Sequence, residues 1–349
     1  YISIFFCVQI IALNLFAMQP KVTPVDYVRP QIDTHKSRWF FFSSASRPFG
    51  MVSLSPDTWT EGSWNSGYLY NSKEIRCFSH VHCWQLAGVP VMPTTGEVKG
   101  HKGMDAYKST YSHETEIVKP GYHKVELDTY QIRVELTSTS RVGMHRYTYP
   151  AGEKANVLFD VGALLAHGKT EKAAIHRISS KEIGGYSVLA PTSRRKKPVT
   201  VYFVARFNQN MTAFGGWEKE GKEKKLVHKN SIEGADIGGY ASFGKLKKQT
   251  LLMKVGISYV SEEQARINLE KELAHWNFDR VKEDAFAEWN RELGKITVEG
   301  GSEEEKIKFY TDLWHSLLGR HTFSDFNGKY IDNTGEEPVV RQVPLDNGT

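Results

Sequence analysis

The chain has 349 residues and a mass of 39.6 kDa, which exceeds one core of ordinary size and excludes a single small module. Its composition, with 40% hydrophobic and 24% charged residues, is that of a packed globular protein and excludes disordered, collagenous and coiled-coil classes. The net charge is +5, but 45 Lys and Arg residues are spread among 40 Asp and Glu residues without the clustering that tracking a phosphate backbone needs. Nucleic acid is therefore not an expected partner.

The chain begins with an almost unbroken apolar run over residues 1–17. This pattern is typical of the hydrophobic region of a secretory signal whose start is missing, with a candidate cleavage site at residues 15–17. The alternative is a membrane anchor, for which the run is slightly short and contains Gln9 and Asn14. We interpret residues 1–20 as a signal peptide remnant, predict no other membrane segment, and expect a secreted, periplasmic or cell-surface protein.

Cysteine is scarce, because Cys7 lies in the apolar leader and only Cys77 and Cys83 follow it. If residues 77–83 form one strand, a rise of about 3.3 Å per residue separates these two cysteines by roughly 20 Å, which is beyond disulfide reach. We expect no internal disulfide and predict that both cysteines are buried as small hydrophobic side chains. An exported protein of this size can build a core that needs no disulfides.

From about residue 32 to about residue 260, hydrophobic residues recur with a period of two. In residues 131–137, Ile132, Val134 and Leu136 fall on one face and charged residues on the other, as in a half-buried antiparallel strand. Similar runs follow at residues 142–149, 156–161, 200–207 and 250–259, with Gly and Pro turn signals between them. Many short strands without intervening helices predict a mainly β domain over residues 27–260, arranged as a sandwich.

The period changes to that of a helix after residue 260. Ser261 with Gln264, and Ser302 with Glu305, have the spacing of capping boxes, so each pair predicts a helix start. Apolar residues recur at helical spacing after both caps and again over residues 281–293. We predict a helical linker over residues 261–300 and the truncated start of a second, helical domain over residues 301–349.

The apolar stripe of the last predicted helix lies within residues 307–317. A lone amphipathic helix must bury such a stripe against a partner. Because the sequence begins without Met and stops in residues 345–349 without closing an element, we interpret it as a fragment cut at both ends. The partner of the stripe is therefore expected beyond Thr349.

The most informative stretch is residues 76–93, with two histidines and two cysteines within seven positions. Strand alternation places His80, His82 and Trp84 on one face and Cys77 and Cys83 on the other, so four metal ligands cannot converge, and the spacing fits no standard zinc pattern. The histidine face offers imidazole donors and an indole, which together hydrogen-bond hydroxyls and stack on a sugar ring. The alternative is that the aromatic rings belong to the core and the histidines are structural.

Arg47 and Asp57 stand among turn-forming Pro and Gly residues. They are either a polar clamp on loops or a structural ion pair. The sequence has no nucleophile elbow, P-loop or dinucleotide fingerprint, and no pair of carboxylates is singled out by spacing. The residue types alone therefore indicate an exported β-sandwich with an aromatic and polar face.

A series of short segments in fixed order resembles the amino-terminal half of glycoside hydrolase family 92, the calcium-dependent exo-acting α-mannosidases. The segments are residues 47–57, 67–70, 78–82, 90–93, 107–114, 120–122, 135–139, 145–150, 255–261, 289–290 and 309–313. The resemblance implies a β-supersandwich similar to galactose mutarotase, then linker helices and the start of an (α/α)₆ barrel. It also implies inverting hydrolysis of terminal α-mannosides of N-glycans or mannans, by an acid and a base roughly 6.5 to 9.5 Å apart, with calcium gripping the sugar.

In this family the catalytic acid, base and calcium ligands lie mostly in the barrel. The resemblance therefore implies that they lie beyond Thr349, that the missing barrel is the main partner of this chain, and that the fragment alone is inactive and holds no metal. The sandwich is expected to supply sugar contacts, and the candidates are His80, His82, Trp84, Gln85, Arg47 and Asp57. A Gly- and Asp-containing turn is commoner in the family after the two histidines, so linkage preference does not follow from the resemblance.

Two other functions are alternatives to this one. A non-catalytic carbohydrate-binding module would bind mannosides without hydrolysing them, but the unpaired apolar stripe of the last helix argues against an independent module. A sandwich enzyme of different chemistry would carry its whole site within residues 30–260.

Overall fold

A computed structural model of the chain describes residues 22–35, 42–60, 67–83, 86–163, 169–193 and 195–344, with the backbone alone at residues 83, 86 and 87. The predicted signal segment, residues 1–20, lies outside these ranges. Within them, no helix has both the length and the apolar character needed to cross a membrane.

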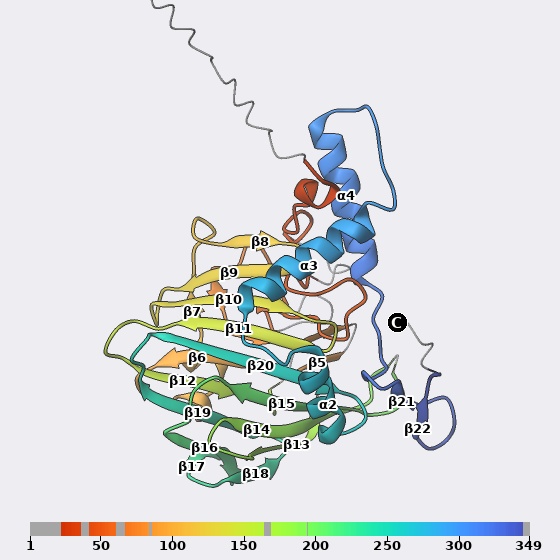
Figure 1. Cartoon of the computed structure of the whole chain (residues 1–349). Coiled ribbons are helices and arrows are strands. Elements are labelled where there is room, and N and C mark those ends of the chain that lie inside the picture. Colours follow the sequence, from red (N-terminus) through yellow and green to blue (C-terminus); the bar gives the residue numbers. More distant parts are fainter. Residues whose placement is uncertain are drawn as a thin grey trace, which may run out of the picture.

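Two antiparallel sheets pack face to face, which confirms the predicted sandwich (Figure 1). One has seven strands in the described residues, in the order β1 (Ser55–Asp57), β3 (Cys77–Ser79), β6 (Val91–Thr95), β12 (Lys154–Phe159), β19 (Gly238–Lys245), β16 (Ala213–Glu220) and β17 (Glu223–Val227). The other has nine, in the order β18 (Ser231–Gly234), β13 (Thr170–Arg177), β14 (Glu182–Leu189), β15 (Val199–Phe207), β20 (Thr250–Ser258), β11 (Val142–Thr148), β10 (Ile132–Ser138), β9 (Tyr122–Leu127) and β8 (Ile117–Lys119).

Short strand pairs and helices complete the described structure. The strand pairs are β2 (Glu74–Ile75) with β7 (Ser109–Thr110), β4 (Val81–Cys83) with β5 (Leu86–Gly88), and β21 (Lys329–Asp332) with β22 (Val339–Gln342). The helices are the 3₁₀ turns η1 (Pro24–Tyr27) and η2 (Gly100–Lys102), and α1 (Met104–Tyr107), α2 (Glu262–Glu272), α3 (Phe278–Leu293) and α4 (Glu303–Leu318).

The core lies between the two sheets and follows the period of two. In β10, Ile132, Val134 and Leu136 are buried while Arg133 is exposed, as the alternation predicts. Glu135 departs from this pattern because it is buried in an ion pair with Arg146, at 2.7 Å.

The predicted helix starts are present. The Ser261 side chain accepts a hydrogen bond from the Gln264 amide at the start of α2, and Ser302 forms a complete capping box with Glu305 at the start of α4. Helix α2 packs on the outer face of the nine-stranded sheet (Figure 1), where Leu269 joins a buried cluster with residues of β11 and β15. Gly256 of β20 permits this close approach, since a Cβ there would lie 2.4 Å from the Ala265 carbonyl oxygen.

The buried part of the α4 stripe has its partner within this chain, contrary to the expectation that this partner is absent, while Ile307, Leu313 and Leu317 stay half-buried. Tyr310 and Trp314 pack against Trp289 of α3 and against Val25 and Val28 at the start of the described chain. Figure 1 shows η1 beside α4, away from the sandwich. The period of α4 identified the buried residues Tyr310 and Trp314, but the η1 segment that packs on this helix is bonded to it across 282 positions, where periodicity gives no signal.

Candidate functional site

Residues 77–88, the most informative stretch of the sequence, do not form one strand. Strand β3 belongs to the seven-stranded sheet between β1 and β6, whereas among the described strands β4 pairs with β5 in a separate two-stranded sheet. His80 lies at the break, where its amide donates to the Gly88 carbonyl at 3.0 Å and its carbonyl accepts from the Ser53 amide at 2.9 Å. The predicted single alternation across this stretch is therefore wrong, because the chain changes sheets at His80.

Side chains from both predicted faces meet on the Asp57 carboxylate, which is 0% exposed. Its Oδ1 lies 2.7 Å from His82 Nε2, and its Oδ2 accepts from Ser79 Oγ at 2.5 Å and from Cys77 Sγ at 3.2 Å. Cys77 is a free, buried thiol, as predicted, and burial together with the neighbouring Asp57 raises its pKa well above the usual range. Both oxygens of this buried carboxylate therefore have hydrogen-bond partners, as a buried charge requires.

His82 carries a positive charge in this arrangement. Its Nδ1 lies 2.6 Å from the Ser53 carbonyl oxygen and its Nε2 faces Asp57, so both ring nitrogens face acceptors and both must donate. Burial by itself lowers the pKa of His82, but the Asp57 charge and the hydrogen bonds to Asp57 and Ser53 outweigh it and raise the pKa above 6.5. Asp57 and His82 form a buried ion pair between β1 and β4.

His80 is neutral, although it lies only two positions away. Its Nδ1 donates to the Val89 carbonyl at 2.7 Å, so its Nε2 accepts from His145 Nε2 at 2.8 Å. His145 Nδ1 in turn accepts from the Tyr147 hydroxyl at 2.9 Å. Burial lowers the pKa of His80 to about 4, and burial and the adjacent His80 lower the pKa of His145 well below its usual range.

This geometry bears on the predicted sugar contacts. All four ring nitrogens of His80 and His82 have partners inside the protein, so neither imidazole can donate to a sugar hydroxyl without losing one of them. Trp84 and Gln85 follow β4 directly in sequence and lie outside the described residues. The two buried networks hold the chain at the start of β4.

The structure places Arg47 away from Asp57, so the suggested pairing of these two residues is wrong. Arg47 Nη1 lies 2.5 Å from Glu288 of α3, and its other nitrogens donate to the carbonyls of Ser138 at 2.7 Å and Val281 at 3.2 Å. A loop ahead of β1 is thereby tied both to β10 and to α3. Arg47 clamps the sandwich to the helical segment.

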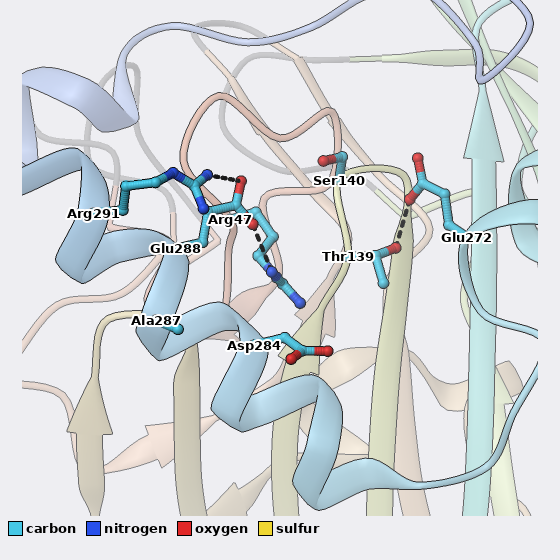
Figure 2. Close-up of a pocket in the computed structure, with 8 residues that line it drawn as sticks. All are labelled: Arg47, Thr139, Ser140, Glu272, Asp284, Ala287, Glu288 and Arg291. Carbon is cyan, nitrogen blue, oxygen red and sulfur yellow. Dashed lines mark hydrogen bonds and ion pairs between the residues drawn. The ribbon is translucent and has the colours of Figure 1, made fainter. Parts of the chain in front are cut away.

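This clamp forms part of a polar cavity of about 520 Å³ between the sandwich and α3 (Figure 2). Figure 2 shows Arg47 and Arg291 both directed at Glu288, and Thr139 donating to Glu272 at 2.6 Å. Most of the charges that line the cavity are thus paired with one another. The remaining lining residues are Ser140, Asp284 and Ala287.

In the described ranges, no three or more His, Cys, Asp or Glu side chains are grouped so that they could hold a metal ion.

Sequence reasoning missed His145 and Glu288, the partners of His80 and Arg47. His145 and Tyr147 occupy alternate positions of a predicted strand, so a pair of polar aromatic side chains on its buried face was an available signal. Glu288 carried no such signal, because it is one acidic residue among many on a half-exposed helix.

Two family descriptions match adjacent parts of the chain. Residues 27–258 match the glycosyl hydrolase family 92 N-terminal domain, and residues 264–342 match the glycosyl hydrolase family 92 catalytic domain. A curated relative from Arthroderma benhamiae, described as an uncharacterized secreted glycosidase, is 23% identical over 330 residues, which are 85% of this chain and 40% of the relative.

Solved structures give a similar result. The family GH92 α-mannosidase BT3965 from Bacteroides thetaiotaomicron is 28% identical with a TM-score of 0.81, over 94% of this chain and 45% of that one. Its complex with mannoimidazole matches with a TM-score of 0.80 over 93% and 43% of the two chains. The inverting mannosidase BT2199 from the same species, 24% identical over 93% and 44%, shares the fold with a TM-score of 0.78. The chain thus spans less than half the length of the relatives that it matches.

Proposed function

The chain belongs to glycosyl hydrolase family 92, and from this premise we propose that it is the amino-terminal part of an exported enzyme that hydrolyses terminal α-linked mannose from N-glycans or mannans with inversion. The observation that carries the proposal is the likeness, at 28% identity over 94% of the chain, to a family GH92 α-mannosidase that has also been solved with mannoimidazole. The description of the fungal relative as secreted supports export.

In this proposal the sandwich contributes sugar contacts. The carboxylates that act as acid and base in the hydrolysis lie outside the described residues. Trp84 stacks on the sugar and Gln85 hydrogen-bonds its hydroxyls. His80, His82 and Asp57 are positioning residues, since their hydrogen bonds hold the strands next to that turn. Arg47 maintains the angle between the sandwich and α3. Calcium is part of the proposal because the family resemblance implies it.

The test is mannose release by the enzyme with its complete catalytic domain. On an aryl α-mannoside, Trp84→Ala is expected to lower kcat/KM by about tenfold or more, since a lost stacking contact and its buried area cost about 1.5 kcal/mol or above. Leu226→Ala is the control, because Leu226 is a partly exposed apolar residue on β17, at the opposite edge of the same sheet from β1.

Two further measurements separate the parts of the proposal. NMR of the first product is expected to show β-mannose, as inversion requires, and chelation is expected to abolish turnover. Retained α-configuration would contradict inversion, and activity indifferent to both chelation and Trp84→Ala would contradict the proposed site. Mannoside binding without release would instead support the carbohydrate-binding module.

A further inference from the structure

A second cavity, of about 420 Å³, lies at the end of the nine-stranded sheet. It is enclosed by the loop that leads into β15, by the end of β20, and by the segment that carries the β21–β22 hairpin. Its lining residues are Arg195, Pro198, Val199, Thr200, Tyr202, Tyr259, Val260, Phe323, Ile331, Asn333 and Pro338. None of them belongs to the Asp57 and His80 networks or to the Arg47 cavity.

The walls of this cavity are held by buried hydrogen bonds on one side and by exposed ones on the other. Asp325, 1% exposed, accepts from Ser258 Oγ at 2.9 Å and from Asn268 Nδ2 at 2.7 Å, which fixes the segment containing Phe323 on the sandwich. On the other side, Lys197 Nζ donates to the carbonyls of Asn333, at 2.9 Å, and Gly335. The hairpin is thus tied to the loop before β15, so the cavity has a defined shape.

Aromatic rings supply much of its surface. The Tyr259 and Phe323 rings lie 5.2 Å apart at an angle of 36°, and Phe323 is 51% exposed. Tyr202, half-buried on β15, adds a third ring. Such ring faces pack well against the apolar C–H face of a pyranose.

Polar groups stand beside these rings. Thr200 and Asn333 bring a hydroxyl and an amide, which can donate to and accept from sugar hydroxyls. The Arg195 guanidinium is turned to the protein, because its Nη atoms donate to the backbone carbonyls of Leu189, Ala190 and Lys197 and its Nε is buried. The cavity therefore offers neutral hydrogen-bonding groups, which suit hydroxyls better than a carboxylate or phosphate.

We propose that this cavity is a secondary carbohydrate site that binds a pyranose residue of a glycan, apart from the residues assigned to hydrolysis. Its volume falls within the range of roughly 300 to 1,000 Å³ that is typical of small-molecule sites. Aromatic walls with a few neutral donors are the combination that recognises a ring with one apolar face and a hydroxyl rim. The choice of mannosides as its ligands rests on the proposed function, whereas the cavity and its lining do not.

The test is binding of methyl α-D-mannopyranoside and of α-linked mannobiose to the enzyme with its complete catalytic domain, followed by saturation-transfer NMR in excess mannoimidazole. We expect binding that mannoimidazole does not displace and that Phe323→Ala and Tyr202→Ala each weaken by about fivefold or more. Phe326→Ala is the matched control, because Phe326 is 44% exposed on the same segment and does not line the cavity.

The outcomes separate this site from the hydrolytic one. Turnover of an aryl α-mannoside is expected to be unchanged in the Phe323 and Tyr202 variants, whereas Trp84→Ala lowers it and leaves the second binding event intact. Complete displacement by mannoimidazole would overturn the proposal. So would equal weakening by Phe326→Ala, which would indicate a role of the whole segment instead of the cavity.

Discussion

His80 and His82 lie two residues apart and are both buried, yet they carry different charges. The region around His82 is ionic: its imidazolium faces the Asp57 carboxylate, which Ser79 and Cys77 also contact. The region around His80 is a neutral chain of hydrogen bonds. The Tyr147 hydroxyl donates to His145, His145 donates to His80, and His80 donates to the Val89 carbonyl. Depth of burial does not distinguish the two regions.

The difference lies in the partners that other strands bring to each ring. The Asp57 carboxylate from β1 can stabilise a positive charge on a buried imidazole. The His145 imidazole from β11 can accept or donate a hydrogen bond, but as a neutral group it cannot compensate a positive charge. The charge of a buried histidine is therefore decided by residues that are 25 and 65 positions away in this chain. Four experiments test this difference in charge.

The largest effect is expected for Asp57→Asn, which leaves the His82 imidazolium buried without its counter-ion. Breaking a buried pair by removing one partner costs about 4 kcal/mol of unfolding free energy. Urea unfolding followed by tryptophan fluorescence measures it. Asp105→Asn is the control, since Asp105 is exposed and also forms ion pairs, and its unfolding midpoint is expected to stay unchanged. A small effect of Asp57→Asn would mean that the ionic region is not charged.

The two histidines are expected to give stability opposite pH dependences. The pKa of His80 is lowered to about 4, so the unfolded state binds more protons between pH 6.5 and 4, and stability falls on acidification by on the order of 3 kcal/mol. The pKa of His82 is raised, so its contribution is fully present below pH 6.5 and is lost as pH rises through the folded value.

Urea unfolding at a series of pH values checks both signs. His80→Gln is expected to flatten the acid side of the stability profile, and His82→Gln the alkaline side. If either variant kept the slope of the unsubstituted protein on its own side, the charge assigned to that histidine would be wrong.

Gly143→Ala acts on the neutral region alone. A Cβ at this position of β11 would lie 2.7 Å from His80 Cδ2 and 3.1 Å from its Nε2, so His80 must move away from His145. We expect a loss of about 2 kcal/mol, as for overpacking in a core, measured by the same unfolding assay. Gly319→Ala, where the nearest atom is 3.8 Å away, is expected to change little. Similar losses in both would mean that the contact with His80 is not the cause, since propensity alone favours Ala over Gly.

The smallest effects come from deleting one hydroxyl in each region. Ser79→Ala removes a donor to a carboxylate and is expected to cost about 2 kcal/mol, whereas Tyr147→Phe removes a donor to a neutral ring and is expected to cost about 1 kcal/mol. Thermal and urea unfolding of the two variants side by side give the ranking. The reverse order would contradict the assignment of charge.

Much of the fold follows from local pattern. The alternation in residues 131–137 and the caps at Ser261 and Ser302 depend on neighbours along the chain, and the structure confirms them. The helical stripe of α4 was also identified, but its partner was not, because η1 is close to it only in three dimensions.

The candidate site was harder to predict for the same reason. The histidines, Arg47 and Asp57 were found from residue type, but their partners were not. Alternation across residues 77–83 assumed one continuous strand, whereas the chain changes sheets at His80 and brings Ser79 and His82 to the same carboxylate. Residue type suggests which side chains can react, and only topology determines which of them meet.

The packing of η1 against α3 and α4 has a consequence for synthesis in the cell. The Arg29 amide donates to Thr311 Oγ1 across 282 positions of the chain, and Val25 lies in the same cluster as Trp289 and Trp314. At roughly 10 residues per second, the ribosome needs about half a minute to produce the helices on which this early segment docks. Until then Val25 and Val28 lack the helices on which they pack, so the sandwich can complete its own pairing before this part of the segment docks.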